Sequence, residues 1–268
     1  MKSESGFFAI NGAQLYVEVA GAGPPLLLVH GFSFDSRMWD DQFEPFAHHF
    51  RVIRYDLRGF GRSQLPDNEP YAHADDLRAL LDQLHVERAT LLGMSLGGQI
   101  AIDATLTYPE RVDKLLLVDA ALHGHKWSQD WRELAAQIWR QGRQGNVSLS
   151  KQLWMDHPLF APAMQKSHSR HQLQRLINDY SGWHWAHRDP KRESDPPAAE
   201  RLETIEHSTL VVIGSEDLPD FQVIAAMLEH SLPNVQAISV SGAGHMVNME
   251  RAELFNSIVL DFLGDTPK

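Results

Sequence analysis

One serine in this chain lies among small residues where an apolar run meets a helix-like segment. The stretch TLLGMSLGGQIAIDA covers residues 90–104 and contains the pattern G-x-S-x-G around Ser95. A serine hydroxyl is a weak nucleophile unless a base takes its proton. A sharp turn from strand to helix would expose that hydroxyl, and Gly93 and Gly97 would relieve the crowding of such a turn. We therefore expect Ser95 to be a nucleophile.

A histidine and an aspartate that could serve this serine follow other apolar runs. Asp217 comes shortly after TLVVIG, and His245 comes shortly after VQAISV. The carboxyl ends of parallel strands meet at one edge of a sheet, so all three side chains should lie there. In that arrangement His245 takes the proton from Ser95 and later donates it to the leaving group. Asp217 would fix the imidazole tautomer and stabilise the imidazolium.

Three other carboxylates compete with Asp217 as the acid. Asp119 ends the strand-like run KLLLVD and is the main rival. Glu216 is adjacent to Asp217, and Asp220 lies three residues further on. If Asp119 is not the acid, it is a polar contact at the base of the segment that follows.

The elements that must position these residues alternate between strand and helix. Six short apolar runs predict buried strands, and Asn11-Gly12 predicts a hairpin before them. Apolar residues at helical spacing lie between the runs. The sequence therefore predicts an α/β fold with a doubly wound, mostly parallel sheet. The predicted strands are 25–30, 51–56, 89–93, 114–119, 209–214 and 235–240, and the helical stripes cover 77–84, 221–228 and 255–262.

The alternation stops between residues 122 and 200. This segment has no strand-like run, yet it holds six of the seven tryptophans and two helical stripes, at 131–138 and 173–180. We expect a helical cap insertion at 122–200 that divides the α/β core into 1–121 and 201–268.

In its motifs and their order, the chain resembles the α/β-hydrolase fold superfamily, in its group of esterases, lactonases and C–C bond hydrolases. The similarity covers 20–121 and 201–268. It rests on LLLVHGFSFDSRMW (26–39), VIRYDLRGFGRS (52–63), GMSLGG (93–98), LVVIGSEDLPD (210–220) and SGAGHMVNME (241–250). The resemblance implies the catalytic order Ser95, Asp217, His245. It also implies an oxyanion hole made by the backbone N–H groups of Phe32 and Leu96.

Other motifs receive structural interpretations. His30 is expected to hold the loop after the first parallel strand, as the resemblance implies. The glycine-rich DLRGFGRS is interpreted as a turn with contacts between Asp56 and Arg58, because it lacks the lysine and spacing of a phosphate-binding loop. In the insertion, Trp131 is interpreted as packing, whereas Trp183 and Trp185 are predicted to line the substrate pocket.

The composition argues against several classes of binding partner and cofactor. The formal net charge of −11 and the absence of a Lys/Arg-rich block argue against nucleic acid or an anionic membrane surface. The chain has no cysteine, and its histidine pairs lack a cysteine or acidic partner, so we expect no metal and no cofactor. No apolar run is long enough for a spanning helix, and the first residues lack a signal-peptide core. We expect a cytoplasmic protein of unknown oligomeric state.

These observations predict a serine hydrolase that cleaves small to medium carboxylic esters, with apolar or aryl groups, or lactones. The main alternative is a 3-oxoadipate enol-lactonase-like enzyme or a C–C bond hydrolase of aromatic degradation. A cofactor-free perhydrolase and a non-enzymatic receptor are weaker alternatives, since a receptor typically lacks an intact triad.

Overall fold

The computed structural model describes residues 3–264 and contains one eight-stranded sheet. The strand order is β1-β2-β4-β3-β5-β6-β7-β8. β1 and β2 pair antiparallel, as do β2 and β4, and the other neighbours are parallel. The predicted doubly wound, mostly parallel sheet is confirmed. The strands are β1 (Ser3–Ile10), β2 (Ala13–Ala20), β3 (Pro25–Val29), β4 (Arg51–Tyr55), β5 (Ala89–Met94), β6 (Val112–Val118), β7 (Ser208–Gly214) and β8 (Val235–Val240).

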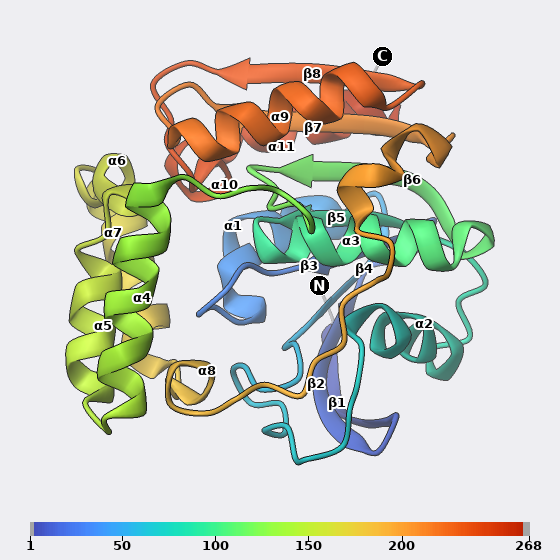
Figure 1. Cartoon of the computed structure of the whole chain (residues 1–268). Helices are drawn as coiled ribbons and strands as arrows, with labels where there is room; N and C mark the ends of the chain where they lie inside the picture. The colour runs from blue at the N-terminus through green and yellow to red at the C-terminus, as the bar shows by residue number, and fades with distance from the viewer. Residues whose placement is uncertain (1–2, 265–268) are drawn as a thin grey trace.

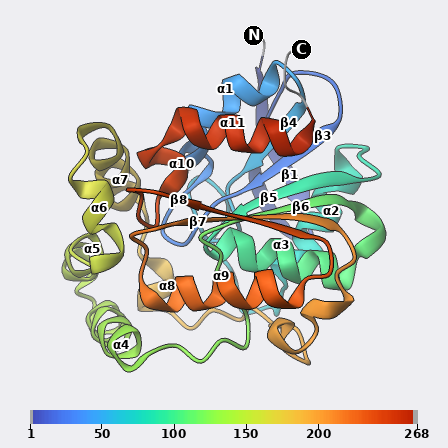
Figure 2. The same ribbon diagram turned by 90° about the horizontal axis from the view of Figure 1, so that it is seen from above.

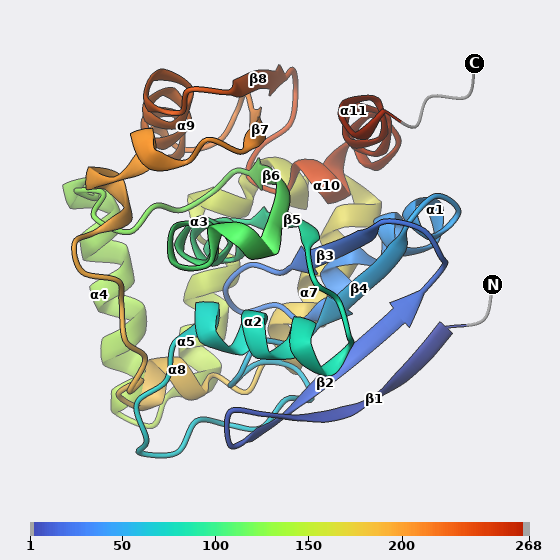
Figure 3. The ribbon, with the colours of Figure 1, turned by 90° about the vertical axis from the view of Figure 1, so that its right-hand side faces the viewer.

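The predicted hairpin joins β1 to β2 at Asn11 and Gly12. Both residues have positive φ, 45° and 81°, as a two-residue hairpin turn with the right-handed strand twist requires. Figure 3 shows the resulting twist of the sheet, which fans from β1 and β2 at one end to β7 and β8 at the other.

Helices cover both faces of the sheet. Figure 2 shows α1 and α11 on one face and α3 and α9 on the other. Pro219 opens α9 at a position where a missing N–H costs nothing, and Gly264 ends α11 in the left-handed conformation. The core helices are α1 (Asp40–Ala47), α2 (His73–Gln83), α3 (Leu96–Thr107), α9 (Pro219–Ser231), α10 (Val247–Glu250) and α11 (Ala252–Leu263).

The segment between β6 and β7 is helical, as its two stripes at helical spacing and its lack of strand-like runs predict. Figure 1 shows α4, α5 and α7 stacked in a layer that faces the arrowheads of β6 and β8, so it lies at the carboxyl ends of the strands. We call residues 122–200 the helical insertion. Its helices are α4 (Gln129–Arg143), α5 (Val147–Met155), α6 (Ala161–Met164), α7 (Ser167–Asp179) and α8 (Trp183–Ala186).

Short 3₁₀ turns complete the chain, and the sheet forms the core. The turns are Ser36–Trp39, Pro109–Arg111, Pro158–Phe160, Ala198–Glu200 and Leu202–Thr204. Leu26–Val29 of β3 and Leu115–Val118 of β6 are fully buried, which matches strands covered on both faces. No helix within residues 3–264 is both long and apolar enough to cross a bilayer.

Candidate active site

Ser95 stands on the sharp turn between β5 and α3. Its backbone has φ 53° and ψ −115°, a conformation that L-residues rarely adopt. A side chain at Gly93 would overlap the carbonyl oxygen of Gly97, and one at Gly97 would overlap that of Val29. A third glycine, Gly98, lets α3 approach the end of β6 closely. The turn therefore depends on its glycines, and it leaves the Ser95 side chain partly accessible.

His245 and Asp217 meet at the same edge of the sheet. Nδ1 of His245 lies 2.8 Å from Oδ2 of Asp217, and both side chains are buried. The other oxygen of Asp217 accepts a hydrogen bond from the backbone N–H of Leu218 at 2.7 Å. A carboxylate can only accept, so Nδ1 of His245 carries the proton toward Asp217 and Nε2 is left with its lone pair. Phe221 packs against the imidazole with ring centroids 4.2 Å apart.

Asp119, the rival acid, lies behind this pair. One of its oxygens accepts from the backbone N–H of Gly214 at 2.8 Å, and the other has no hydrogen-bond partner among residues 3–264. Asp119, Asp217 and His245 each place a polar atom within 4.8 Å of the others. Burial, reinforced by the charge of Asp217, raises the pKa of Asp119 well above its ordinary value. A neutral Asp119 can donate its proton toward Asp217, whereas Asp217 alone bonds the imidazole.

The loop that carries His245 is held by a carboxylate that the sequence reasoning missed. Glu250, at the end of α10, accepts from the backbone N–H groups of Gly244 and Met246. Lys166 of the helical insertion donates to the same carboxylate at 2.9 Å. A glutamate five residues after the histidine was visible in the sequence, but its inward orientation depends on the tight turn into α10.

Two backbone segments that could form an oxyanion hole pack against each other. Gly31 lies against Met94, the residue before Ser95, so the loop after β3 adjoins the turn. Within the described part of the chain, the backbone N–H groups of Phe32 and Leu96 have no protein acceptor. The Leu96 amide also opens α3, where the helix dipole favours negative charge.

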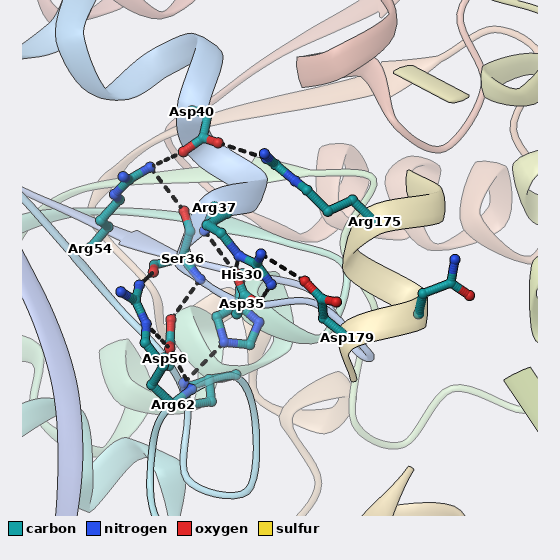
Figure 4. A network of polar contacts seen from close by, with 12 residues as sticks. His30, Asp35, Ser36, Arg37, Asp40, Arg54, Asp56, Arg62, Arg175 and Asp179 are labelled. Carbon is teal, nitrogen blue, oxygen red and sulfur yellow. Dashed lines mark hydrogen bonds and ion pairs between the residues drawn. The ribbon is translucent and has the colours of Figure 1, made fainter. Parts of the chain in front are cut away.

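A network of polar contacts fixes the loop after β3 (Figure 4). His30 is fully buried, and its Nε2 accepts from the backbone N–H of Leu57 at 2.9 Å. Its Nδ1 lies 2.8 Å from the carbonyl oxygen of Gly31, so it carries the proton there. His30 therefore ties the loop after β3 to the loop after β4, in keeping with its structural interpretation.

The expected contact between Asp56 and Arg58 is wrong. Asp56 accepts from the backbone N–H groups of Ser36 and Arg62, both at 2.8 Å. Arg58 instead makes a two-pronged ion pair with Asp76 on α2, with both distances 2.9 Å. Each of the two side chains thus stabilises a different neighbour: Asp56 the turn at Ser36 and Arg62, and Arg58 the helix α2 through Asp76.

Six aromatic rings surround Phe32, and all but Phe60 come from the helical insertion. The centroid of its ring lies 5.5 to 6.1 Å from those of Phe60, Trp139, Trp154, Tyr180, His184 and Trp185. Nε1 of Trp154 also donates to Oγ of Ser33 at 2.7 Å. Ser33 has a positive φ of 64°, so this buried hydrogen bond supports a strained residue next to the Phe32 amide. The helical insertion thus packs against the loop after β3 and stabilises its conformation.

The two tryptophans predicted to line the substrate pocket contact other aromatic residues of the helical insertion. Trp185 is fully buried and packs edge-on against Tyr180, and Trp183 stacks on His187. Neither lines the 670 Å³ cavity between the helical insertion and the start of α9, whereas Trp131 does. Trp131, interpreted from its helical spacing as packing, also stacks on Trp127 at 4.6 Å. Substrate contact by Trp183 and Trp185 stays a prediction that this arrangement does not favour.

Among residues 3–264, Asp119, Asp217 and His245 are the three side chains grouped closely enough to share a metal ion. The hydrogen bond between His245 and Asp217 already accounts for two of them. The histidine pairs of the insertion have separate partners: His168 contacts Asp41, and His184 contacts Tyr180. Activity without a metal stays a prediction.

Comparison with known proteins gives a family and several relatives. A family model described as alpha/beta hydrolase fold matches residues 24–252. An uncharacterized protein of Mycobacterium tuberculosis is 39% identical over 116 residues, which are 42% of this chain and 34% of that protein. The chain thus aligns with only about a third of that relative's length. A putative 2-succinyl-6-hydroxy-2,4-cyclohexadiene-1-carboxylate synthase of Bacillus subtilis is 30% identical over 91% of this chain and 93% of that protein. The carboxylesterase YbfK of the same organism is 27% identical over 98% of this chain and 88% of that protein.

Solved structures share the fold over nearly the whole chain. A hydrolase from Pseudomonas aeruginosa has a TM-score of 0.80 at 28% identity, covering 97% of this chain and 98% of that one. The enol-lactonase from Burkholderia xenovorans has a TM-score of 0.80 at 24% identity, covering 97% and 100%.

Proposed function

This chain belongs to the alpha/beta hydrolase fold family, and we propose that it is a serine hydrolase that cleaves carboxylic esters. The observation that supports this most is the 2.8 Å hydrogen bond between His245 and Asp217, at the sheet edge where Ser95 stands on its strained turn. The residues proposed as nucleophile, base and orienting acid thus follow three parallel strands, β5, β8 and β7, and acyl transfer needs these three roles together.

In the proposed reaction, Nε2 of His245 removes the proton from Oγ of Ser95 as that oxygen attacks the ester carbonyl. The backbone N–H groups of Phe32 and Leu96 stabilise the negative charge that develops on the carbonyl oxygen. His245 then donates its proton to the leaving alcohol, and an acyl group remains on Ser95. A water molecule, deprotonated by His245, releases the acid and restores the serine. No metal or cofactor takes part.

The helical insertion is proposed to act as the cap that selects the substrate. It covers the carboxyl ends of the strands, and its rings surround Phe32. Lactones are cyclic esters and would pass through the same acyl-enzyme. The carboxylesterase relative supports the ester proposal, and the enol-lactonase neighbour shares the fold. Cleavage of an activated C–C bond is the second candidate, since a 2-hydroxy-6-oxononadienedioate/2-hydroxy-6-oxononatrienedioate hydrolase is 28% identical over 95% of the chain.

Turnover of a substrate panel tests this proposal. The purified protein is assayed with p-nitrophenyl acetate and butyrate, a set of lactones, and a dienoate, with Ser95→Ala as the control. We expect rapid ester turnover by the native protein and a loss of roughly 10⁶-fold in kcat for the variant. Turnover of the dienoate alone would favour C–C cleavage, and an unreactive panel would contradict the proposal.

A further inference from the structure

A cavity beside the triad is not used by the chemistry described above. It has a volume of about 670 Å³ and lies between α4, the 3₁₀ turn Pro158–Phe160 and the start of α9. Its apolar wall is formed by Trp131, Leu134 and Leu218. Leu218 directly follows Asp217, so the cavity reaches the residue next to the triad acid.

One buried imidazole lines this cavity and uses only one of its two ring nitrogens in a hydrogen bond. His157 lines the cavity and is 4% exposed. Its Nδ1 accepts a hydrogen bond from the backbone N–H of Leu159 at 3.1 Å, which caps the 3₁₀ turn. The proton of the neutral ring therefore sits on Nε2, which has no hydrogen-bond partner among residues 3–264. His157 thus lines the cavity with one N–H donor that is not used by the protein itself.

The position of the cavity identifies which half of an ester it would hold. His245 donates its proton to the leaving alcohol, so the alcohol must lie on the His245 side of Ser95. One residue of the cavity wall reaches toward that side: Trp131 packs against Phe221, and Phe221 packs against His245. His157 packs against Trp131 as well, with ring centroids 5.2 Å apart, so the rings of Trp131 and Phe221 connect His157 to His245.

The charges around the cavity limit the chemistry of its occupant. Asp130, Glu133 and Asp220 line it, and no lysine or arginine does. Asp220 is satisfied by Ser128 and His125, while Asp130 and Glu133 are exposed at the mouth. A carboxylate on the alcohol would be repelled and would find no cation to bind.

We infer that this cavity binds a neutral alcohol portion that carries a hydrogen-bond acceptor, such as an ether or carbonyl oxygen, and that Nε2–H of His157 donates to that acceptor. We call it the leaving-group cavity. The inference rests on the proposed ester hydrolysis and adds the class of alcohol. The apolar wall of the leaving-group cavity holds the carbon chain of the alcohol. The N–H of His157 selects alcohols with a matching oxygen over apolar alcohols of equal length.

Three butyrate esters of similar length test the inference. Their alcohols are 1-butanol, 2-methoxyethanol and 3-hydroxypropanoate, and kcat/KM is measured for the native protein and for His157→Asn. Asparagine can still cap Leu159 but is too short to replace the Nε2–H. We expect the variant to lower the preference for the methoxyethyl over the butyl ester by about threefold to tenfold, as for one lost hydrogen bond. His157→Gln, which places an amide N–H near the Nε2 position, should restore part of that preference.

The carboxylate ester gives an independent readout. Glu133→Gln should raise its kcat/KM relative to the methoxyethyl ester, whereas Glu110→Gln, at the opposite edge of the sheet, should not. If all three esters are hydrolysed but His157→Asn and Glu133→Gln leave both ratios unchanged, the inference fails and the proposed function stands. If no ester is hydrolysed, both fail.

Discussion

The two buried carboxyl groups near His245 differ in their contacts, and this difference predicts different effects of the same substitution. Asp217→Asn should lower kcat/KM on p-nitrophenyl butyrate by about 10⁴-fold, because an amide cannot hold the required imidazole tautomer. Asp119→Asn should stay within about tenfold of the native value. Its amide oxygen can still accept from Gly214, and its N–H₂ group can donate toward Asp217. Equal losses in the two variants would contradict the assignment of the acid to Asp217.

His157 should make the fold sensitive to acid. Burial, with a smaller effect of the nearby His245, lowers its pKa from an ordinary 6.5 to about 4. Between those values the unfolded chain binds a proton that the folded protein does not, so the free energy of unfolding falls as the pH drops. The part of the unfolding free energy that comes from this pKa difference is fully present above about pH 6.5, and about 2 kcal/mol of it is lost at pH 5.

Urea unfolding at pH 7 and pH 5 measures this effect. The decrease in unfolding free energy between the two pH values should be smaller by about 2 kcal/mol in His157→Asn than in the native protein. His230→Asn, on the exposed end of α9, serves as the control and should leave the decrease unchanged. An identical decrease in all three proteins would show that His157 binds its proton normally in the folded state.

Strands and helices were predictable because each carries its own local pattern. Every predicted strand has a counterpart within two residues, since fully buried parallel strands need continuous apolar runs. The tryptophans of the helical insertion were not predictable in the same way. Trp131 has helical spacing, which indicates a buried stripe but does not say whether the stripe meets a core or a cavity. Trp185 lies in a four-residue helix, too short to show a stripe.

The different surroundings of these two tryptophans, the cluster around Phe32 for Trp185 and the cavity for Trp131, predict opposite consequences of their removal. Trp185→Ala should lower the free energy of unfolding by about 3–5 kcal/mol, because its fully buried ring would leave a cavity, and the preferred ester should not change. Trp131→Ala should change the relative kcat/KM of butyrate esters with short and long alcohols, and should destabilise the protein less. Thermal unfolding and the two rates separate these outcomes. A changed ester preference in Trp185→Ala alone would return that residue to the substrate pocket.

In the molecule as a whole, the helical insertion is attached to the core by buried rings, by the pair of Lys166 with the buried Glu250, and by exposed ion pairs. Figure 4 shows the pairs between Arg37 and Asp179 and between Arg175 and Asp40. Exposed pairs are screened and contribute little, so Arg175→Ala should lower the free energy of unfolding by less than about 1 kcal/mol. A loss of several kcal/mol, or strong destabilisation of the native protein in 0.5 M NaCl, would show that charge attaches the insertion.

The sequence could predict which strand ends carry Ser95, Asp217 and His245, because the parallel topology brings those ends together. It could not predict the cavity beside them. That cavity forms where α4 and the turn after His157 approach the start of α9, and the angle between insertion and core is set by packing between residues distant in the sequence. For the same reason, the contact between Lys166 and Glu250 could not be predicted from the sequence of either segment alone.

Covalent labelling of Ser95 tests the central claim most directly. The native protein is treated with a serine-directed fluorophosphonate, its intact mass is measured, and the labelled peptide is sequenced, with Ser95→Ala and His245→Ala in parallel. The proposed mechanism predicts one label per chain on Ser95 in the native protein, none in Ser95→Ala, and much slower labelling in His245→Ala, because the base that activates the serine is gone. A label on another residue, or equal labelling rates in the native protein and His245→Ala, would contradict it.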